Sequence, residues 1–173
     1  MDEIFNRGTC RYFKELTPVP DEELLTLVKA GMQARAVGNQ KSRDFIIVTR
    51  EDLVKAISHN SIIAGPARKA SAAIVIVGKK DGISFPEEWS FDCAAAAQNI
   101  LIEAELLGLS TMWMQVSPYP DRKIHLCHIL DISTDEDPFC IIAVGYADRR
   151  PVRLNRYDEN AVSYDLYGNH KKK

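Results

Sequence analysis

Residues 92–108 read DCAAAAQNILIEAELLG, which is the strongest helical pattern in the chain. Asp92 is a suitable N-cap and Gly108 a suitable helix stop, so we predict a helix over residues 92–107. Four consecutive alanines allow a second helix to approach closely, and apolar residues resume from Ile100 onward. A helix that is apolar over so much of its surface packs at the centre of a domain or at an interface between subunits.

Four short apolar runs around this helix predict β-strands. They cover residues 45–48, 72–78, 111–114 and 139–145. The run AAIVIVG at 72–78 is apolar on both faces, which is typical of a central strand.

Helical spacing and start signals predict further helices between these strands. We expect a short helix within residues 2–13 that runs into a basic turn, and longer helices over 20–34 and 121–130. Another helix is expected to begin at 49–52, with Thr49 as its N-cap. Because strands and helices intermix without regular β-α-β alternation, we predict an α+β fold.

The overall composition is that of a globular protein. The chain has 173 residues, 46% of them hydrophobic, which excludes a largely disordered chain and fits one domain. Its net charge of -2 is not that of a protein that holds nucleic acid on a strongly basic surface. No apolar run is long enough to span a membrane, and the four cysteines are widely spaced. We therefore expect a cytoplasmic protein with no membrane or nucleic-acid partner.

The pattern of regular elements fails from residue 148 onward. The last 26 residues carry Pro151, several arginines and apolar side chains such as Leu154 and Tyr167 at no regular spacing. We divide the chain into a core over 1–147 and a C-terminal arm over 148–173. An arm that packs on a partner subunit would give those apolar residues a place to be buried.

Several common motifs of catalysis are missing. The sequence has no G-x-G-x-x-G, no G-x-x-x-x-G-K-[ST] and no G-x-S-x-G, so it lacks a dinucleotide fingerprint, a phosphate loop and a hydrolase elbow. His125, Cys127 and His128 lack further ligands at suitable spacing, and zinc usually takes at least three from the protein. We predict no metal site.

Two groups of arginines could converge on a phosphate. Arg7, Thr9 and Arg11 alternate around the expected basic turn, and the arm carries Arg153 and Arg156. Guanidinium groups bind phosphate oxygens in a bidentate manner. From composition alone, scattered surface arginines are the simpler interpretation.

Five segments carry a resemblance that changes this balance. Residues 7–13, RGTCRYF, resemble the R-R-S-x-R-x-F opening of the nitroreductase family of FMN-dependent oxidoreductases, and residues 34–45 are similar to its A-P-S-x-x-N-x-Q-P-W-x-F segment. Residues 92–99 match D-x-x-x-A-x-Q-N, 108–113 match G-L-G-T-x-W, and 142–146 match a late strand that ends in G-Y. Each match is weak alone, but five in the family's order are specific.

The resemblance implies a fold and an assembly. The family fold is α+β, with a mostly antiparallel central sheet flanked by helices. It forms an obligate homodimer with two FMN sites at the subunit interface. The arm over 148–173 would be exchanged across the dimer and add a strand to the partner's sheet, while 1–147 would form the FMN-binding core.

The resemblance also implies site residues. Arg7, Gly8 and Thr9 would hold the FMN phosphate and ribityl chain, and Arg11 would lie near flavin N1 and O2, where a cation stabilises the reduced flavin. Arg153 and Arg156 would complete the phosphate site. The residues expected to border the flavin ring are Trp113, Met114, Gln115 and Val116, with the Val116 N–H near N5. Those expected to reach it from the other subunit are Arg35, Ala36, Val37 and Asn39.

The implied function is an FMN-dependent oxidoreductase. It would use NADH or NADPH to reduce a flat electron-poor acceptor, such as a nitroaromatic or a quinone, by ping-pong hydride transfer. No catalytic side chain is expected, because the flavin carries the chemistry.

The sequence departs from the family pattern at Gly8, at Arg35 and at 41–43, where Lys-Ser-Arg replaces Q-P-W. The added cations favour an anionic donor or substrate. The altered segment also leaves open a flavin-binding protein that does not turn over NAD(P)H: a redox sensor, a carrier or an enzyme with another reductant. A flavin-free interaction module is a third possibility.

Overall fold

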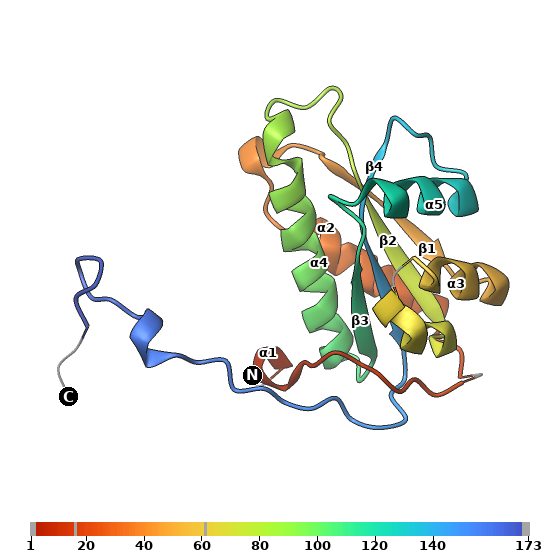
Figure 1. Ribbon diagram of the computed structural model, residues 1–173, viewed down its shortest axis with the longest axis horizontal. Helices are drawn as coiled ribbons and strands as arrows, with labels where there is room; N and C mark the ends of the chain where they lie inside the picture. Colours follow the sequence, from red (N-terminus) through yellow and green to blue (C-terminus); the bar gives the residue numbers. More distant parts are fainter. Residues whose placement is uncertain (1–2, 16, 61, 171–173) are drawn as a thin grey trace.

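The fold was established from a computed structural model that describes residues 3–15, 17–60 and 62–170, those at 62–64 by their backbone alone. The first two residues and the basic run at 171–173 lie outside the described residues. Figure 1 shows one sheet-and-helix body from which the C-terminal arm extends.

A four-stranded antiparallel sheet forms the centre of this body. Its strands are β1 (Arg43–Val48), β2 (Ala72–Gly78), β3 (Ser110–Gln115) and β4 (Asp137–Gly145), in the order β1-β2-β4-β3. All seven residues of β2 are buried, which confirms the prediction of a central strand. The four predicted strands and the mostly antiparallel sheet are therefore confirmed.

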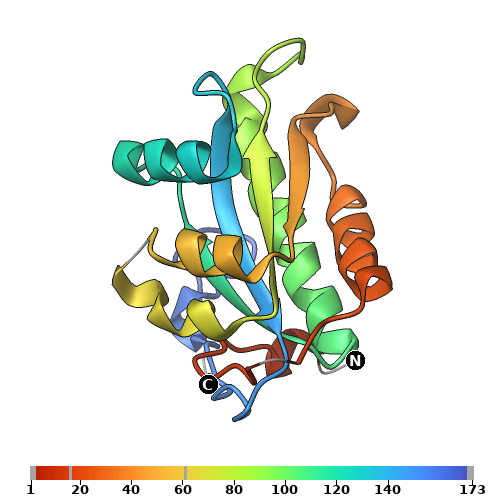
Figure 2. The same ribbon diagram turned by 90° about the vertical axis from the view of Figure 1, so that its right-hand side faces the viewer.

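Helices cover both faces of the sheet (Figure 2). α2 (Asp21–Met32) and α4 (Trp89–Leu106) pack on one face, and α3 (Glu51–Ser58), the 3-10 helix η2 (Ile62–Lys69) and α5 (Pro120–Leu130) on the other. Side chains along β2 alternate accordingly: Ile74 joins the cluster under α2 and α4, and Val75 the cluster under α3 and α5. Fully burying one such side chain stabilises the fold by about 1.5–3 kcal/mol.

α4 departs from its prediction at its start, whereas its predicted packing at the centre of the domain is confirmed. It begins at Trp89, so Asp92 lies within its first turn and is not its N-cap. Ala96 and Ala97 are fully buried in the chain's own core and are not on its outer face. The close helix approach is made by α2, where a Cβ added at Gly31 would lie 3.0 Å from Ile100 Cδ1. Gly108 ends the helix with φ +72°, as predicted.

Two other helices also differ from the sequence predictions, α1 in its length and α3 in its N-cap. The N-terminal helix α1 covers only Glu3–Asn6, and the chain then runs extended, with β-bridges from Thr9 to Thr111 and from Phe13 to Ala147. Helix α3 begins after Arg50, and no side chain caps it, so Thr49 is not its N-cap. The remaining short elements are η1 (Val37–Asn39), η3 (Pro86–Glu88) and η4 (Glu159–Ala161).

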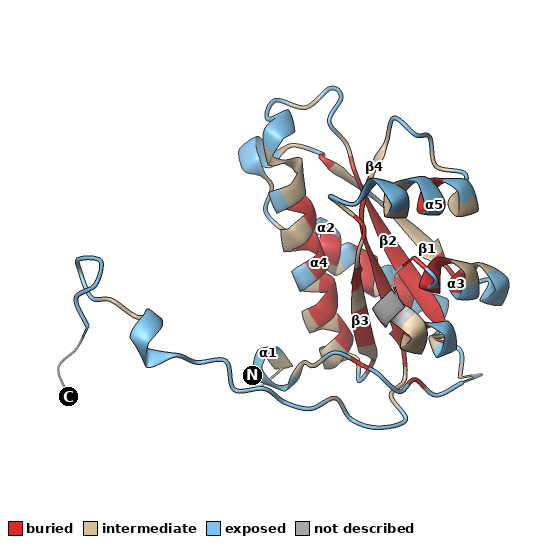
Figure 3. Cartoon of the chain, in the orientation of Figure 1, coloured by how far each residue is buried: buried red, intermediate tan, exposed pale blue. Residues whose placement is uncertain are grey.

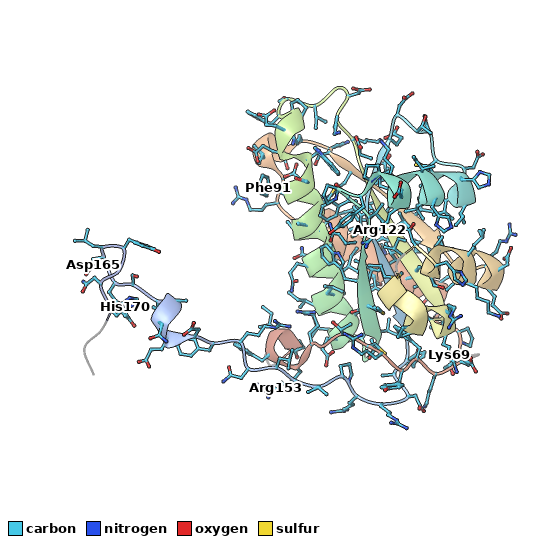
Figure 4. All side chains as sticks on the ribbon, viewed as in Figure 1. Lys69, Phe91, Arg122, Arg153, Asp165 and His170 are labelled. Carbon is cyan, nitrogen blue, oxygen red and sulfur yellow. The ribbon has the colours of Figure 1, made fainter. Side chains whose placement is uncertain are left out.

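The C-terminal arm leaves the body after Ala147 and is exposed along most of its length (Figure 3). The residues Val152 and Leu166 are 77% and 75% exposed, which is far more than apolar residues in a core show. The end of the arm is nevertheless folded on itself, because the Tyr164 N–H donates to Asn169 O and His170 Nδ1 lies 2.8 Å from Val162 O. Figure 4 places Asp165 and His170 far from the body.

Candidate functional site

The RGTCR motif occupies residues 7–11, and from Thr9 onward it runs as an extended segment along the open edge of β3. The Cys10 N–H donates to Thr111 O at 2.8 Å, and the Cys10 side chain is buried. Thr9 and Arg11 on either side are exposed. In extended backbone, alternate side chains share a side. This geometry replaces the predicted tight turn and still places the Thr9 hydroxyl and the Arg11 guanidinium together.

Arg7 carries a donor that no described group satisfies. Its Nε is buried and has no hydrogen-bond partner among the residues that the structure describes. A buried donor without an acceptor costs about 1–3 kcal/mol. An anion beside Arg7 would remove that cost, and guanidinium is well suited to phosphate oxygens.

The start of the arm crosses this segment. A Cβ added at Gly8 would lie 2.6 Å from Cβ of Pro151 and 3.2 Å from Val152 O. Arg153 follows directly after Val152 and is exposed. Arg156 lies further along the exposed arm. Gly8 replaces the second arginine of the family motif, and the passage of the arm leaves no room for a side chain there.

Arg11 lies at one side of a cavity of about 700 Å³ between the N-terminal segment and the helices α3 and η2. Lys55, Arg68 and Lys69 also line this cavity, together with Glu15 and Asp148. The Lys69 ammonium is paired with Glu15 at 3.1 Å, and the Lys55 ammonium is paired with Glu51. Arg11 thus borders a cavity of mixed charge.

The end of β3 is held rigid by side-chain hydrogen bonds. Trp113 Nε1 donates to Gln115 Oε1 at 2.7 Å, and Gln115 Nε2 donates to Ser117 O at 2.6 Å. Arg122 Nη1 donates to Gln115 O at 2.8 Å. The Met114 side chain is buried in the core under α3 and α5, so it is not available to border a cofactor.

The main-chain donor on this edge differs from the one predicted. The Val116 N–H donates to Phe139 O at 3.1 Å, so it is not available to flavin N5 in this conformation. Thr111 O faces away from β4, because it accepts from Cys10. Main-chain groups of alternate strand residues share a side, so those of Trp113 and Gln115 also face the open edge. Gln115 is the last of them, and its N–H points there.

The segment with residues 35–39 lies elsewhere. Arg35, Val37 and Asn39 are exposed and Ala36 is half-buried. The Val37 N–H donates to Asp92 Oδ1 at 3.0 Å, which fixes this segment to the first turn of α4. The same carboxylate accepts from Gln40 Nε2 at 2.8 Å and from Ser42 Oγ at 2.6 Å. Burial acts to raise the Asp92 pKa, but these hydrogen bonds outweigh it and the pKa is lowered.

Within one chain, residues 35–39 lie far from the N-terminal segment at 7–11. The 35–39 segment sits at the start of α4, and Thr9 lies beside Thr111, which follows shortly after the end of α4. An 18-residue helix is about 27 Å long. The two sets therefore lie at opposite ends of the molecule (Figure 1).

Comparison with known proteins identifies the family. A protein of Archaeoglobus fulgidus, provisionally named an NADH dehydrogenase/NAD(P)H nitroreductase, is 31% identical over 144 residues, which cover 83% of this chain and 82% of that one. The chain belongs to the nitroreductase family. The family model "Nitroreductase family" matches residues 62–146.

Solved structures of other nitroreductase-family proteins share the fold. A protein of Clostridium acetobutylicum, provisionally named an NADH oxidase, is 32% identical with a TM-score of 0.90, over 96% of this chain and all of that one. An FMN-dependent nitroreductase from Clostridium difficile is 25% identical with a TM-score of 0.86, over 96% and 100% of the two chains. The α+β nitroreductase fold is thus confirmed.

Some features of this nitroreductase-family chain were missed or are absent. Sequence reasoning assigned Asp92 to a helix cap and overlooked its hydrogen bonds to a segment 50 residues away, for which no local sequence signal exists. No group of three His, Cys, Asp or Glu in the described part of the chain could hold a metal ion. Among the same residues, no helix is long and apolar enough to cross a membrane.

Proposed function

We propose that this nitroreductase-family protein is an FMN-dependent oxidoreductase. It takes electrons from NADH or NADPH and delivers them to a flat electron-poor acceptor such as a nitroaromatic or a quinone. The observation that carries the proposal is the buried Arg7 Nε in the family's N-terminal motif, which has no hydrogen-bond partner among the described residues. Relatives with 31% and 25% identity are named for NAD(P)H and for FMN, respectively.

The described residues fit the phosphate end of FMN. The Arg7 guanidinium and the Thr9 hydroxyl offer donors from the extended segment, and Arg153 offers a cation from the arm that crosses it. Guanidinium donors favour phosphate over a neutral group, because charge-assisted hydrogen bonds are about twice as strong as neutral ones. Arg156 would add to this site from further along the arm.

The edge of β3 fits the ring end. Bound FMN supplies the hydride-transfer chemistry, and the protein supplies position and charge. Arg11 would place a cation beside the ring, where it stabilises negative charge. The Gln115 N–H faces the same open edge, and its backbone is held by Arg122. We assign to Gln115 the main-chain donor role that the resemblance gave to Val116.

The site would be completed by a second copy of the chain. Arg35–Asn39 are too far from Arg7 to reach the same FMN within one chain, so a second copy must present them. The outer face of α4 has a mostly apolar stripe at Phe91, Ala95, Ile102 and Leu106, interrupted by Gln98, with Phe91 67% and Leu106 56% exposed. This spacing is that of one helix face. In such a homodimer the exposed arm would pack on the partner.

Of the cations expected to face the electron donor or acceptor, Arg35, Lys41 and Arg43, only two are exposed. Arg43 turns inward and donates through Nη2 to Ala34 O, so it does not face a substrate. Arg35 and Lys41 are exposed. Arg35 and Lys41 therefore still favour an anionic donor or acceptor, but Arg43 does not contribute to this preference.

The test is reconstitution followed by steady-state kinetics. Purified protein incubated with FMN and desalted should retain one FMN per chain. It should then oxidise NADH or NADPH with a quinone or nitroaromatic acceptor and give parallel double-reciprocal lines, as a ping-pong enzyme does. Tight FMN binding without oxidation of either nucleotide would favour a flavin-binding protein with another role. Failure to retain FMN would contradict the proposal.

A further inference from the structure

We propose that Asp92 is a positioning residue that holds the 35–40 segment of one copy against the FMN bound by the other. The inference rests on the proposed function, because it assumes that FMN binds at a site shared between two copies. It assigns a role to a carboxylate that touches neither the cofactor nor the substrate.

Asp92 accepts hydrogen bonds from three groups of one distant segment. Oδ1 accepts from the Val37 N–H, and Oδ2 accepts from Gln40 Nε2 and from Ser42 Oγ, all at 2.6–3.0 Å. The Asp92 residue is only 3% exposed. A buried carboxylate with three donors holds them through charge-assisted hydrogen bonds, which are the strongest kind available to a loop.

Two further contacts fix the same segment from its other side. The Gln40 side-chain amide donates to Phe85 O at 3.1 Å and accepts from the Phe85 N–H at 3.0 Å. The Phe85 ring also lies over Gly38, where an added Cβ would be 2.7 Å from it. Gly38 has φ +57°, a conformation that glycine adopts without strain. The segment is therefore held by Phe85, the residue before η3, as well as by Asp92 of α4.

These contacts hold the segment so that its outward-facing residues can reach the FMN of the second copy. Gln40 and Ser42 point inward to Asp92, while Arg35, Val37 and Asn39 are exposed. All three groups that contact Asp92 are donors, so only a charged carboxylate satisfies them all. An asparagine at position 92 would turn an NH2 group toward at least one of these donors.

The variant Asp92→Asn tests the role, with Ala96→Gly as the matched control. Ala96 lies one turn further along α4 and is fully buried in the core cluster under α2 and α4. We expect D92N to weaken FMN binding by about tenfold or more while the dimer persists, and to speed hydrogen exchange at the Val37 amide. A96G should bind FMN like the wild type and leave exchange at Val37 unchanged.

Mixed dimers test whether the action crosses between copies. Differently tagged chains that carry D92N and Arg7→Ala are coexpressed, and the mixed dimer is purified. One of its two sites then combines a normal Arg7 with a normal 35–40 segment, and the other combines both defects. We expect one tightly bound FMN per mixed dimer, although each parent homodimer binds FMN weakly.

The outcomes separate this inference from the function on which it rests. Wild-type binding of FMN by D92N overturns the inference alone. Weak FMN binding at both sites of the mixed dimer overturns the action across the interface. A wild-type protein that binds no FMN overturns the proposed function, and the inference falls with it.

Discussion

Pro151 lies so close over Gly8 that a Cβ added at Gly8 would be 2.6 Å from Cβ of Pro151. The first residues of the C-terminal arm are thereby fixed against the same segment that holds Arg7 and Thr9. The arm thus passes beside this segment of its own chain, with Arg153 directly after the contact, before it extends away from the body.

Substituting Gly8 with alanine should displace the arm. Contacts below 3.0 Å are not tolerated, and the Pro151 ring cannot move away without the backbone. We expect Gly8→Ala to weaken FMN binding and to loosen the arm, so that trypsin cleaves faster after the already exposed Arg153 and Arg156, as followed by mass spectrometry. Gly65→Ala is the control, because the nearest atom to its new Cβ would be Arg68 Nη2 at 3.9 Å. Equal cleavage in the two variants would show that the contact does not anchor the arm.

Replacing Arg7 should affect FMN and riboflavin differently. Arg7→Ala removes a charged donor from the phosphate, so FMN binding should weaken by about 10- to 100-fold. Riboflavin has no phosphate, and its weaker binding should change little. Arg7→Lys keeps the charge without the bidentate geometry and should recover only part of the affinity. Equal losses for the two flavins, measured by quenching of flavin fluorescence, would place the phosphate elsewhere.

A charge on the outer face of α4 should break the proposed dimer. Phe91 is 67% exposed and points away from the body in Figure 4. In a two-fold interface each substitution acts twice. Phe91→Glu should lose about 1.5–3 kcal/mol of apolar burial per side and give monomers in sedimentation. Ile124→Glu provides the control, because Ile124 is 63% exposed on α5 in the opposite helix layer. An intact dimer in the Phe91 variant would refute the stripe as an interface.

The stability of the protein should fall in acid partly through Asp92. Its pKa is lowered in the folded state, because the hydrogen bonds from Ser42, Gln40 and Val37 outweigh the effect of burial, which raises it. A lowered folded pKa contributes stability above the unfolded pKa, near 3.8, and that stability is lost as the pH falls through the folded pKa. Urea denaturation of wild type and D92N at pH 7 and at about pH 3 should show a smaller difference at the lower pH. A constant difference would mean that Asp92 does not titrate in this way.

The cysteines should be unreactive until the protein unfolds. All four are buried, and burial raises the pKa of the Cys93 thiol to about 12 and that of Cys140 well above its usual value. The thiolate is the reactive form. A thiol reagent at neutral pH should label almost none of them in the native protein and all four in denaturant. Rapid labelling of the native protein would reveal an open state that the structure does not contain.

The sequence predicted the body of the fold well because apolar runs determine it. The run at 72–78 is buried on both faces, as its apolar pattern predicted, and α4 ends before Gly108, whose left-handed conformation stops the helix. Starts of helices were less certain. Asp92 has the chemistry of an N-cap, but a competing set of donors from 37–42 was available to it only after folding.

The candidate site was predictable only where it is continuous in sequence. Thr9 and Arg11 share a side in extended backbone as well as around a turn, so the error in local structure did not change the interpretation of these two residues. The role of Val116 depended on strand register, and its N–H proved to be paired with Phe139 O. The contact of Gly8 with Pro151 joins residues 143 positions apart, and no pattern in either segment announces it.

Anaerobic titration of the FMN-reconstituted protein with NADH and with NADPH tests the central claim most directly. The claim is that the family motif around Arg7, the edge of β3 and a second copy form a site in which FMN is reduced by a nicotinamide donor. We predict that the visible flavin band bleaches in proportion to the donor added, to an end point near one donor per FMN. A flavin band that persists with both donors, in protein that has bound FMN, would contradict it.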